Sequence, residues 1–425
     1  MKKYLSSFLI LMCISLLFSS WGENNINRKD GISNNLKFIS PYKGELSIVA
    51  STPIPPGITP TKEAFNDLIE CGFNVGMENG GIEYFRHIFS LINDLNFKYL
   101  IANADLFNDK RINFVNAFSK NKNFAGWNFT DEPVYDNLKN LKKEYYELYE
   151  LDPNTLIFIN LVGDHIKKFV GDTKNFNDYL DLIQETFRPA VWSYDLYPIY
   201  IKNGKINVSY DIFYSDFEMF SEISKKTKRP FWAYCQSMAF KNSIIERPAA
   251  KEEYLRFEAF SALAYGAQGI VYWTYGQRKS NSMETYTSAL VNLDGKKTKA
   301  WYAAKKVNAE IKKFNGVFYE CDVIKVRHTG QKLYKDTKRL TGDFGPFYKV
   351  QTGDAGVLLS HIMSKTGEYV VIVNHDVKKS QRISLYLKND FEVTELTSHI
   401  GKGKKTFGKI EFNLPKGDWA IFQIK

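Results

Sequence analysis

Cysteine and histidine are scarce in this chain of 425 residues, and their scarcity excludes two kinds of site. Only four cysteines occur, and the three that follow the N-terminal stretch, Cys71, Cys235 and Cys321, are far apart. This spacing forms neither a disulfide framework nor a metal-binding motif. The six histidines are likewise spread along the chain. We therefore expect no metal and no cofactor, and three small buried cysteines.

Long hydrophobic runs are absent except at the N-terminus. There a Lys-Lys pair precedes an apolar stretch from Leu5 to Phe18, and the small residues Ser20 and Gly22 follow it, which is the layout of a secretory signal peptide. No other stretch approaches the roughly 18 to 20 apolar residues that a transmembrane helix needs. We expect cleavage near Gly22 and an exported protein: periplasmic, cell-surface or extracellular. Lipid anchoring at Cys13 is the less favoured alternative, because Met12 precedes it.

Nucleic-acid-binding patterns are also absent, although the chain has a formal net charge of +10. The segment from Cys321 to Lys425 holds 18 basic and 11 acidic residues, and thus accounts for +7 of this charge. It contains no basic helix and no aromatic-rich motif. We interpret the excess as solvated lysines and expect no nucleic-acid partner. A surface for acidic polysaccharide is the alternative.

After a polar segment over residues 23–43, which we expect to be flexible, apolar runs of strand length alternate with segments of helical period. The predicted strands are Leu46 to Ala50, Phe73 to Met77, Lys98 to Ala102, Phe124 to Phe129, Thr155 to Leu161, Ala190 to Leu196, Phe231 to Cys235 and Gly269 to Trp273. The predicted helices are Thr61 to Cys71, Ile82 to Leu95, Ile112 to Lys120, Val134 to Leu151, Asn175 to Phe187, Tyr214 to Lys226, Lys251 to Tyr265 and Thr298 to Phe314.

Eight strand and helix pairs over residues 44–316 predict an α/β fold, a (β/α)8 TIM barrel with a parallel sheet inside a ring of helices. No glycine-rich loop follows the first strand, where the segment Ser51 to Pro56 stands instead, so a dinucleotide fold is disfavoured. From about Val317 the pattern changes to short alternating runs separated by turn residues. These predict a small all-β sandwich over residues 317–425.

Carboxylates, amides and aromatic residues follow the predicted strands, at the ends where barrel enzymes keep their chemistry. The candidate site residues are Glu78, Asn79, Asn103, Asp131, Glu132, Asp195, Tyr197, Gln236, Trp273 and Tyr275. Aromatic faces stack on sugar rings, amides and acids bind hydroxyls, and a carboxylate pair cleaves acetals. The mixture therefore predicts a carbohydrate substrate.

Each candidate has a structural alternative. The run Asp131 to Pro133 could begin the following helix, Asp195 could cap a turn, and Glu78 could be a solvated loop residue. Trp273 and Tyr275 could pack beneath the C-terminal domain. We favour a functional role for the acids on the fourth and sixth strands, because their strand ends converge on one edge of a barrel.

Three segments resemble the clan of (β/α)8-barrel glycoside hydrolases that includes the β-galactosidases and cellulases. They are residues 126–133, with the sequence GWNFTDEP, residues 192–198, with WSYDLYP, and residues 264–273, with AYGAQGIVYW. The resemblance extends over residues 46–316, and the sandwich is similar to accessory domains of such enzymes. In that clan a glutamate at the end of strand 4 is the general acid/base, which implies this role for Glu132.

The chain departs from that clan at two positions. Asp131 replaces the asparagine that contacts the sugar 2-hydroxyl, and a like charge there would help to keep Glu132 protonated. The clan's nucleophile is a glutamate at the end of strand 7, and residues 231–237 contain none, while Glu246 lies too far along the loop. The ordinary retaining mechanism is therefore in question.

We hypothesise that Glu132 protonates the leaving oxygen and that Asp195 is the second carboxylate, attacking the anomeric carbon or activating water. Carboxyl groups about 5 to 5.5 Å apart indicate retention, and about 6.5 to 9.5 Å inversion. The alternative is a carbohydrate-binding protein on a hydrolase barrel that lacks the strand-7 nucleophile. The sequence leaves open the sugar, the linkage, internal or terminal cleavage and the oligomeric state.

Overall fold

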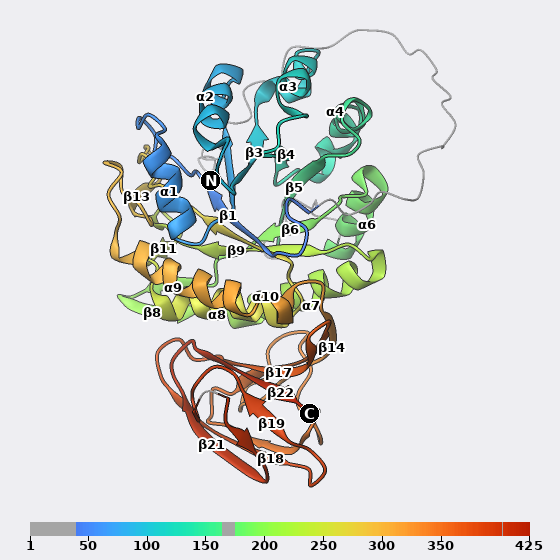
Figure 1. Cartoon of the computed structure of the whole chain (residues 1–425), viewed down its shortest axis with the longest axis vertical. Coiled ribbons are helices and arrows are strands. Elements are labelled where there is room, and N and C mark those ends of the chain that lie inside the picture. The colour runs from blue at the N-terminus through green and yellow to red at the C-terminus, as the bar shows by residue number, and fades with distance from the viewer. Residues whose placement is uncertain (1–39, 164–174, 402) are drawn as a thin grey trace, which may run out of the picture.

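The computed structural model of the chain describes residues 40–163, 175–401 and 403–425. The predicted signal peptide, Cys13 and the predicted flexible segment as far as residue 39 lie outside the described residues. Within the described part, two domains follow one another, and the second packs under helices of the first (Figure 1).

The first domain is a closed barrel of eight parallel strands in the order β1-β12-β9-β6-β5-β4-β3-β2. The strands are β1 (Ser47–Ser51), β2 (Val75–Asn79), β3 (Lys98–Ala102), β4 (Phe124–Asp131), β5 (Leu156–Val162), β6 (Trp192–Asp195), β9 (Phe231–Gln236) and β12 (Gly269–Trp273). The predicted barrel is confirmed, and each predicted strand overlaps an observed one.

Alternate residues of each strand point into the barrel or toward the helices, as the pleat requires. On β1, Val49 belongs to the interior cluster, whereas Ile48 belongs to the larger core between sheet and helices. Tyr42 closes the amino end of the barrel by donating a hydrogen bond of 2.9 Å to the carbonyl of Asn74. The barrel is therefore a packed core, and only the carboxyl ends of its strands are left for a site.

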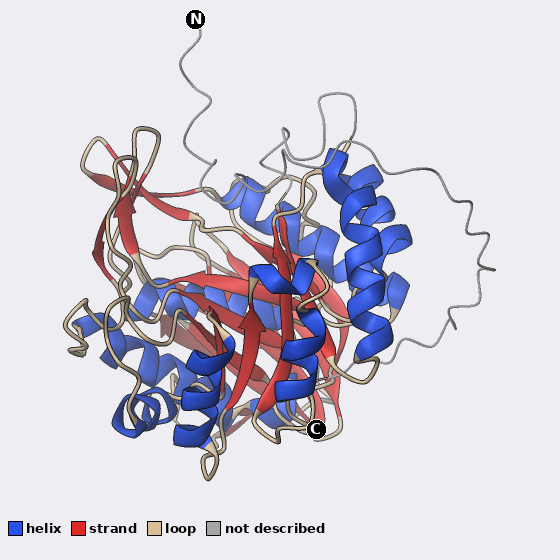
Figure 2. Cartoon of the chain, turned by 90° about the horizontal axis from the view of Figure 1, so that it is seen from above, coloured by secondary structure: helices blue, strands red, loops and turns tan. Residues whose placement is uncertain are grey.

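Helices surround the sheet, as seen from above in Figure 2. They are α1 (Lys62–Glu70), α2 (Ile82–Ile92), α3 (Arg111–Phe118), α4 (Leu138–Leu151), α6 (Phe176–Phe187), α7 (Tyr210–Thr227), α8 (Glu252–Ala264), α9 (Lys299–Lys313) and α10 (Asn315–Phe318), with short 3-10 turns η1 (Ala104–Phe107) and η2 (Tyr135–Asn137). The predicted start of α4 at Val134 is wrong, because β4 continues through Asp131 and η2 intervenes before the helix begins.

The loops after β6, β9 and β12 form a second, antiparallel sheet that the sequence did not predict. Its order is β13-β10-β11-β7-β8. The strands are β7 (Ile199–Lys202), β8 (Lys205–Val208), β10 (Ala239–Lys241), β11 (Glu246–Arg247) and β13 (Thr285–Ser288). This sheet rises from the carboxyl ends of the barrel strands and ties three rim loops together.

The C-terminal domain is an antiparallel sandwich, as predicted. One sheet has the order β14-β16-β17-β22-β19-β20 and the other β15-β18-β21. The strands are β14 (Asp322–His328), β15 (Phe347–Gln351), β16 (Val357–Ser364), β17 (Gly367–Asn374), β18 (Gln381–Leu387), β19 (Val393–Glu395), β20 (Lys405–Thr406), β21 (Lys409–Leu414) and β22 (Trp419–Ile424). On β22, Ala420 and Phe422 face the core between the sheets, whereas Trp419 stacks on Phe260 of α8 with ring centroids 3.8 Å apart.

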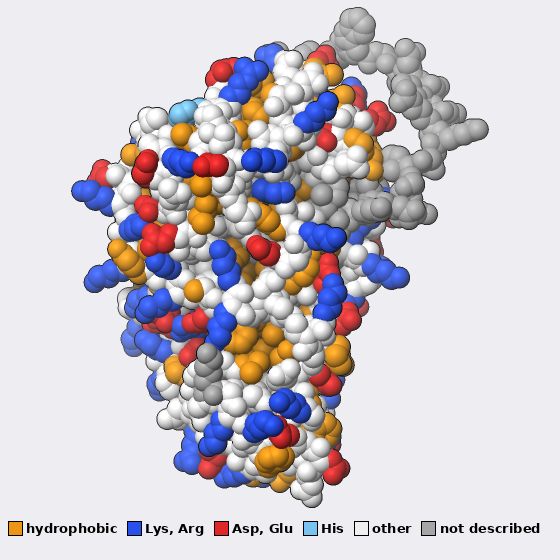
Figure 3. Space-filling view, viewed as in Figure 1, with side chains coloured by type: hydrophobic (Ala, Val, Ile, Leu, Met, Phe, Trp, Pro, Cys, Tyr) orange, Lys and Arg blue, Asp and Glu red, His pale blue; other side chains and the backbone are white. Residues whose placement is uncertain are grey.

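Among the described helices, none has the length and hydrophobicity to span a membrane. On the face shown in Figure 3, basic and acidic side chains are interspersed over both domains. That distribution agrees with the interpretation of the C-terminal lysines as solvated side chains.

Candidate active site

The end of β4 is shaped to present two acids. The pairing of β4 with β5 has a bulge between Asn128 and Thr130, and such bulges re-aim side chains beside active sites. Glu132 has a φ of 46°, a left-handed conformation that is uncommon for a residue with a side chain. Its amide still donates a hydrogen bond of 2.8 Å to the carbonyl of Asn160. The local strain therefore turns the side chain of Glu132 while the backbone stays attached to β5.

A buried amide on β5 joins acids from two neighbouring strands. Asn160 Nδ2 donates to Asp131 Oδ1 at 2.9 Å and to Asp195 Oδ1 at 3.1 Å. Ser193 Oγ in turn donates to Asn160 Oδ1 at 3.0 Å, which fixes the orientation of the amide. The ends of β4, β5 and β6 thus form one hydrogen-bonded unit.

Asp195 lies at the centre of this unit. Desolvation raises the pKa of its carboxyl to about 7, and the charge of Asp131 acts in the same direction. Hydrogen bonds with Asn160, Tyr197 and Glu132 act to lower it. The carboxyls of Asp195 and Glu132 therefore lie close together beside the ends of β6 and β4.

Asp131 is recessed although solvent reaches it. Its side chain is exposed, yet desolvation by the surrounding protein raises its pKa, while Asn160 and the more distant charge of Arg278 act to lower it. A carboxyl with both properties lies in an open hollow rather than on a convex surface. Arg278 belongs to the loop between β12 and β13 and stands over the ring of Tyr286 at 5.5 Å.

Aromatic rings form one wall beside the acids. Tyr197 stacks on Trp273 with ring centroids 5.3 Å apart and an angle of 25° between the planes. Phe240 meets Trp273 edge-on at 5.5 Å. Tyr234 faces the barrel interior, and its hydroxyl is close enough to Asp131, Asp195 and Glu132 for their charges to raise its pKa. Such a wall provides apolar faces for a sugar ring and a hydroxyl for its polar groups.

The end of β9 is neutral where the resembled clan has a carboxylate. Gln236 is buried and bound through Nε2 to the carbonyl of Pro248 at 3.0 Å. Its backbone amide donates to Glu258 Oε2 of α8 at 2.7 Å. Burial raises the pKa of Glu258 to about 8. Glu258 therefore supports the strand from the helix side and lies behind the barrel wall.

Arg247 supports the loop that follows β6. Its Nη1 donates to the carbonyl of Ile199 at 3.0 Å and also to that of Tyr197. Desolvation lowers the pKa of its guanidinium to about 10, so it stays charged at neutral pH. Arg247 thus holds the backbone of the residue that bonds to Asp195.

The structure does not bring every predicted site residue to this place. Glu78 lies on the helix-facing side of β2 and accepts hydrogen bonds from Tyr84, at 2.8 Å, and from Tyr99. Tyr275 is buried and accepts a hydrogen bond of 3.2 Å from Trp301 Nε1 of α9. Neither lies beside the acids, and no finding tests their predicted roles.

The two predicted amides of the early loops lie at the rim. Asn79 is exposed at the end of β2. Asn103 donates a hydrogen bond of 2.7 Å to the carbonyl of Gly80 and accepts one of 2.7 Å from the amide of Asp105. Asn103 therefore orders the loop between β3 and η1. A role in binding remains a prediction for both amides.

Several residues of the site were not among the predicted ones. Asn160 lies near the carboxyl end of the predicted strand Thr155 to Leu161, and this position was the available signal. Arg247 lies in the short strand β11, Glu258 in α8 and Arg278 in the loop after β12, where nothing in the pattern distinguishes them from surface charges. Among the described residues, no cluster of His, Cys, Asp and Glu could hold a metal ion.

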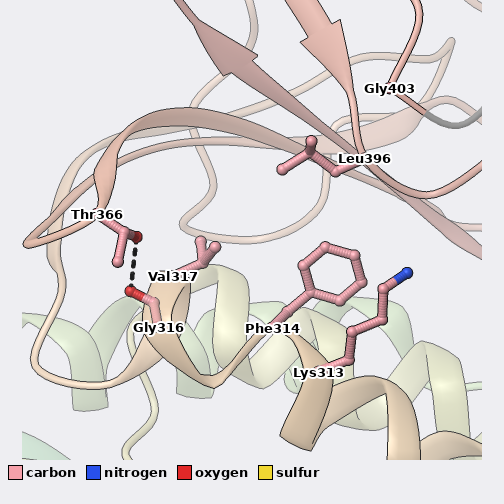
Figure 4. Close-up of a pocket in the computed structure, with 7 residues that line it drawn as sticks. All are labelled: Lys313, Phe314, Gly316, Val317, Thr366, Leu396 and Gly403. Atoms are coloured by element: carbon pink, nitrogen blue, oxygen red, sulfur yellow. Dashed lines mark hydrogen bonds between the residues drawn. The ribbon is translucent and has the colours of Figure 1, made fainter.

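A crevice between the two domains is separate from these acids (Figure 4). Thr366 Oγ1 crosses it by donating to the carbonyl of Gly316 at 2.9 Å. Asn315 Oδ1, beside it, accepts from the amide of Leu46 at 2.9 Å, which places the crevice at the amino end of the barrel. It is lined by Lys313, Phe314, Gly316, Val317, Thr366, Leu396 and Gly403.

Comparisons with known proteins agree with this architecture. The model of glycoside hydrolase family 42, described as β-galactosidase, matches residues 120–314. That match spans β4 to α9 and includes both acids of the pair. The chain carries a glycoside hydrolase barrel. The predicted resemblance and the predicted enzyme class, a glycoside hydrolase, are confirmed at this level.

Solved structures share the fold at low identity. A catalytic mutant of a family 42 β-galactosidase from G. stearothermophilus has a TM-score of 0.63 and 9% identity over 92% of this chain and 100% of its own. The β-galactosidase from Bacillus circulans sp. alkalophilus has a TM-score of 0.62 and 9% identity over 91% and 100%. At this identity the structures establish a common fold alone.

A further solved structure is similar over part of its length. The chain spans 60% of the length of the β-galactosidase from the psychrophilic Marinomonas ef1, with a TM-score of 0.47 and 10% identity over 63% of this chain. No curated protein matches the sequence.

Proposed function

We propose that the protein is an exported glycoside hydrolase in which Glu132 is the general acid/base and Asp195 is the second carboxylate. The observation that carries the proposal is the closeness of these two carboxyls beside the ends of β4 and β6. Acetal cleavage uses two carboxyls that flank the scissile bond, about 5 to 5.5 Å apart in retaining enzymes and about 6.5 to 9.5 Å apart in inverting ones. The glycoside hydrolase barrel provides the setting in which such a pair acts.

Two carboxyls can bond only when one of them carries a proton. The contact with Glu132 acts to lower the pKa of Asp195. We assign the proton to Glu132, the acid of the pair, and the negative charge to Asp195.

Cleavage then proceeds from this starting state. Glu132 transfers its proton to the glycosidic oxygen as the bond from that oxygen to the anomeric carbon breaks. The positive charge that develops on the sugar faces the carboxylate of Asp195. Afterwards Glu132 takes a proton from the water that attacks the anomeric carbon and returns to its acid form.

The contact between the carboxyls favours retention. Inverting enzymes keep their two carboxyls roughly 6.5 to 9.5 Å apart to leave room for a water molecule. A pair this close is nearer to the separation of about 5 to 5.5 Å that retaining enzymes keep. The stacked rings of Tyr197 and Trp273 are the proposed platform for the sugar, and a β-galactoside is the first substrate to test because of the family match.

A panel of nitrophenyl glycosides and oligosaccharides tests the proposal, with product anomers observed by NMR. We expect Glu132→Gln and Asp195→Asn each to lower kcat/KM by roughly 10²-fold to 10⁴-fold. The matched control is Glu246→Gln, a rim carboxylate that pairs with Lys241 at 3.1 Å, which should leave kcat/KM unchanged. Wild-type activity in both acid variants would contradict the assignment.

A second candidate is a carbohydrate-binding protein without catalysis. It is favoured by Gln236, the neutral residue at the end of β9. Calorimetric binding of a glycan with no product from any member of the panel would support this candidate instead. Export is tested separately, by the N-terminal sequence of the mature protein, which we expect to begin near Gly22.

A further inference from the structure

The end of β9 offers no group that can attack a sugar. Gln236 follows Trp232 and Tyr234, both in the interior cluster, so its side chain is directed to the barrel interior by the strand alternation. The side chain is 3% exposed, and Oε1 has no hydrogen-bond partner among the described residues. A neutral amide is a poor nucleophile, so the attacking atom must come from elsewhere.

Asp195 is poorly suited to attack because it is partly buried and surrounded by polar side chains. It accepts a hydrogen bond of 3.1 Å from Asn160, and Tyr197 and Glu132 lie beside it. Its place in the network suits a fixed negative charge better than a group that forms a covalent bond.

Asp131 is more exposed than Asp195. Asn160 donates a hydrogen bond of 2.9 Å to its Oδ1. A carboxylate has about four acceptor positions, so Asp131 can accept a further hydrogen bond from a group in the site. It stands directly before Glu132 in the chain, so a group that it holds lies next to the proton donor.

Tyr234 supplies a complementary donor. Its hydroxyl lies within electrostatic reach of Asp131, Asp195 and Glu132. An acceptor and a donor in one recess, beside the ring of Trp273, match a secondary amide that carries a methyl group. Asp131 accepts the amide N–H, Tyr234 donates to the carbonyl oxygen, and the aromatic wall covers the methyl group.

We propose that the substrate is a 2-acetamido-2-deoxyglycoside and that its own amide carbonyl oxygen is the nucleophile, held by Asp131 and Tyr234. This inference rests on the proposed function, because it uses Glu132 as the acid. It explains why a hydrolase barrel of this kind has a second acid beside Glu132 and a neutral residue at the end of β9. The amide is already attached to the sugar, so the attack is intramolecular and gains the large effective concentration of such reactions.

The proposed reaction has two steps. First, the carbonyl oxygen attacks the anomeric carbon, the bond to the leaving oxygen breaks, and Glu132 gives its proton to that oxygen. The product is a cyclic oxazolinium ion, whose N–H is bonded to the Asp131 carboxylate. Second, water attacks the anomeric carbon and the bond from that carbon to the oxazolinium oxygen breaks, which restores the amide carbonyl. The Glu132 carboxylate takes a proton from the water. The configuration is retained after two inversions.

A matched pair of substrates tests this inference in the full-length mature protein: nitrophenyl N-acetyl-β-galactosaminide and nitrophenyl β-galactoside, with the N-acetyl-β-glucosaminide as a third. We expect kcat/KM to be at least about 100-fold higher with the acetamido sugars. An N-trifluoroacetyl analogue should be hydrolysed more slowly than the N-acetyl sugar, because its carbonyl oxygen is less basic. A sugar-fused thiazoline, which resembles the cyclic intermediate, should inhibit competitively.

Variants of Asp131 and Tyr234 can be compared by their affinity for ligands with and without the acetamido group. A merely structural role of either residue would change both affinities alike. Asp131→Asn should weaken thiazoline binding by about 10-fold or more, and Tyr234→Phe by less, while the affinity for the corresponding sugar without the acetamido group stays the same. The control Asp105→Asn, in η1, should bind the thiazoline like the wild type. Equal losses for both ligands would contradict a role of Asp131 in holding the amide.

The outcomes separate this inference from the proposed function. Equal hydrolysis of both sugars, or covalent labelling of Asp195 by a 2-deoxy-2-fluorogalactoside, would overturn the inference and leave the proposed function intact. Glycan binding without cleavage of any panel member would overturn both. Selective cleavage of the acetamido sugars with no covalent label on the protein supports both.

Discussion

The two sides of the barrel rim differ in charge. On one side, the ends of β4, β5 and β6 present three carboxyls that hydrogen bonds from Asn160 and Glu132 join. On the other, the end of β9 presents the amide of Gln236, which is bound to a backbone carbonyl. Both sides contain a buried amide, but only Asn160 bonds to acids.

This difference shows what each side can contribute to catalysis. The acidic side can supply a proton, a fixed negative charge and an acceptor for a polar group of the substrate. The neutral side can position the substrate but cannot attack it. A complete reaction on this rim therefore needs a nucleophile other than a β9 side chain, and each prediction below changes one side and leaves the other in place.

Among the variants of residues around the two acids Glu132 and Asp195, the largest loss of kcat/KM is expected at Asn160, whose amide joins Asp131 to Asp195. Asn160→Ala removes the donor that Asp131 and Asp195 share, so both carboxyls lose orientation and the pKa of Asp195 rises further. We expect kcat/KM to fall roughly 10-fold to 100-fold. Because Asp195 acts in its ionised form, the wild-type profile of kcat/KM against pH should fall on the acidic side near pH 7. In the variant this fall should move to higher pH.

Asn123→Ala is the matched control for that variant. Asn123 is a buried amide that donates to the carbonyls of Leu95, at 3.0 Å, and Phe97, at 2.7 Å, away from the acids. Both variants should lower the melting temperature, because each leaves buried carbonyl or carboxyl oxygens without a donor. Equal kcat/KM for the two folded variants would contradict a catalytic importance of the bridge.

Making the neutral side acidic is expected to have the next largest effect. Gln236→Glu adds a carboxyl at the end of β9, where the resembled clan has its nucleophile. We expect a 2-deoxy-2-fluoroglycoside to label the peptide that contains position 236 in this variant, as shown by mass spectrometry, and to leave the wild-type peptide unlabelled. Labelling of the wild-type protein at Asp195 would contradict the claim that its nucleophile is not a side chain of the protein.

A smaller effect is expected at the hydrogen bond from Tyr197 to Asp195. Tyr197→Phe keeps the ring that stacks on Trp273 and removes the hydroxyl that lowers the pKa of Asp195. We expect kcat/KM to fall about five-fold, the equivalent of one hydrogen bond of about 1 kcal/mol, and the acidic limb to move to higher pH. The control is Tyr302→Phe, at an exposed position on α9. If the acidic side of the pH profile of kcat/KM did not move in Tyr197→Phe, a contact between Tyr197 and Asp195 would be contradicted.

The smallest expected effect concerns the support behind the neutral side and is one of stability. The pKa of Glu258 is raised to about 8 in the folded protein, above its unfolded value of about 4.3. Its contribution is therefore complete below pH 4.3 and is lost as the pH rises through about 8. Glu258→Gln should flatten this part of the melting-temperature profile, whereas Glu63→Gln, exposed on α1, should not. An unchanged slope in Glu258→Gln would contradict the burial of its charge.

The barrel was predictable because its strands are near-continuous apolar runs and its helices carry one apolar face. Val271 and its neighbours on β12, for example, are buried on both faces of the strand, so nothing polar interrupts the run. The sheet of rim loops was not predictable, because β7, β8 and β10 have at most four residues each and β10 is stabilised by pairing with β13, far along the chain.

The site was predictable in part for a similar reason. Glu132 and Asp195 follow strands whose ends must converge, so their proximity follows from the fold. Glu78 shows the limit of that reasoning. The sequence placed the end of the second strand at Met77, but β2 continues to Asn79, and one further residue of alternation turns Glu78 toward the helices.

The residues that support the site could not be predicted, because their partners are set by tertiary structure. Glu258 bonds to a strand amide 22 positions away in the chain, and Arg247 bonds to carbonyls 48 and 50 positions away. No local spacing encodes such contacts. The departure at the end of strand 7, in contrast, was visible in the sequence, and the structure shows the buried amide that stands there.

The leaving-group dependence of Glu132→Gln tests the central claim most directly, because a general acid matters only when the leaving oxygen needs a proton. The measurement is kcat/KM of the wild type and the variant for glycosides with a dinitrophenyl and with an unactivated sugar leaving group. The account predicts a loss of at least about 100-fold for the sugar leaving group and little loss for dinitrophenol. Equal losses for the two substrates, or no loss for either, would contradict the assignment of Glu132 as the proton donor.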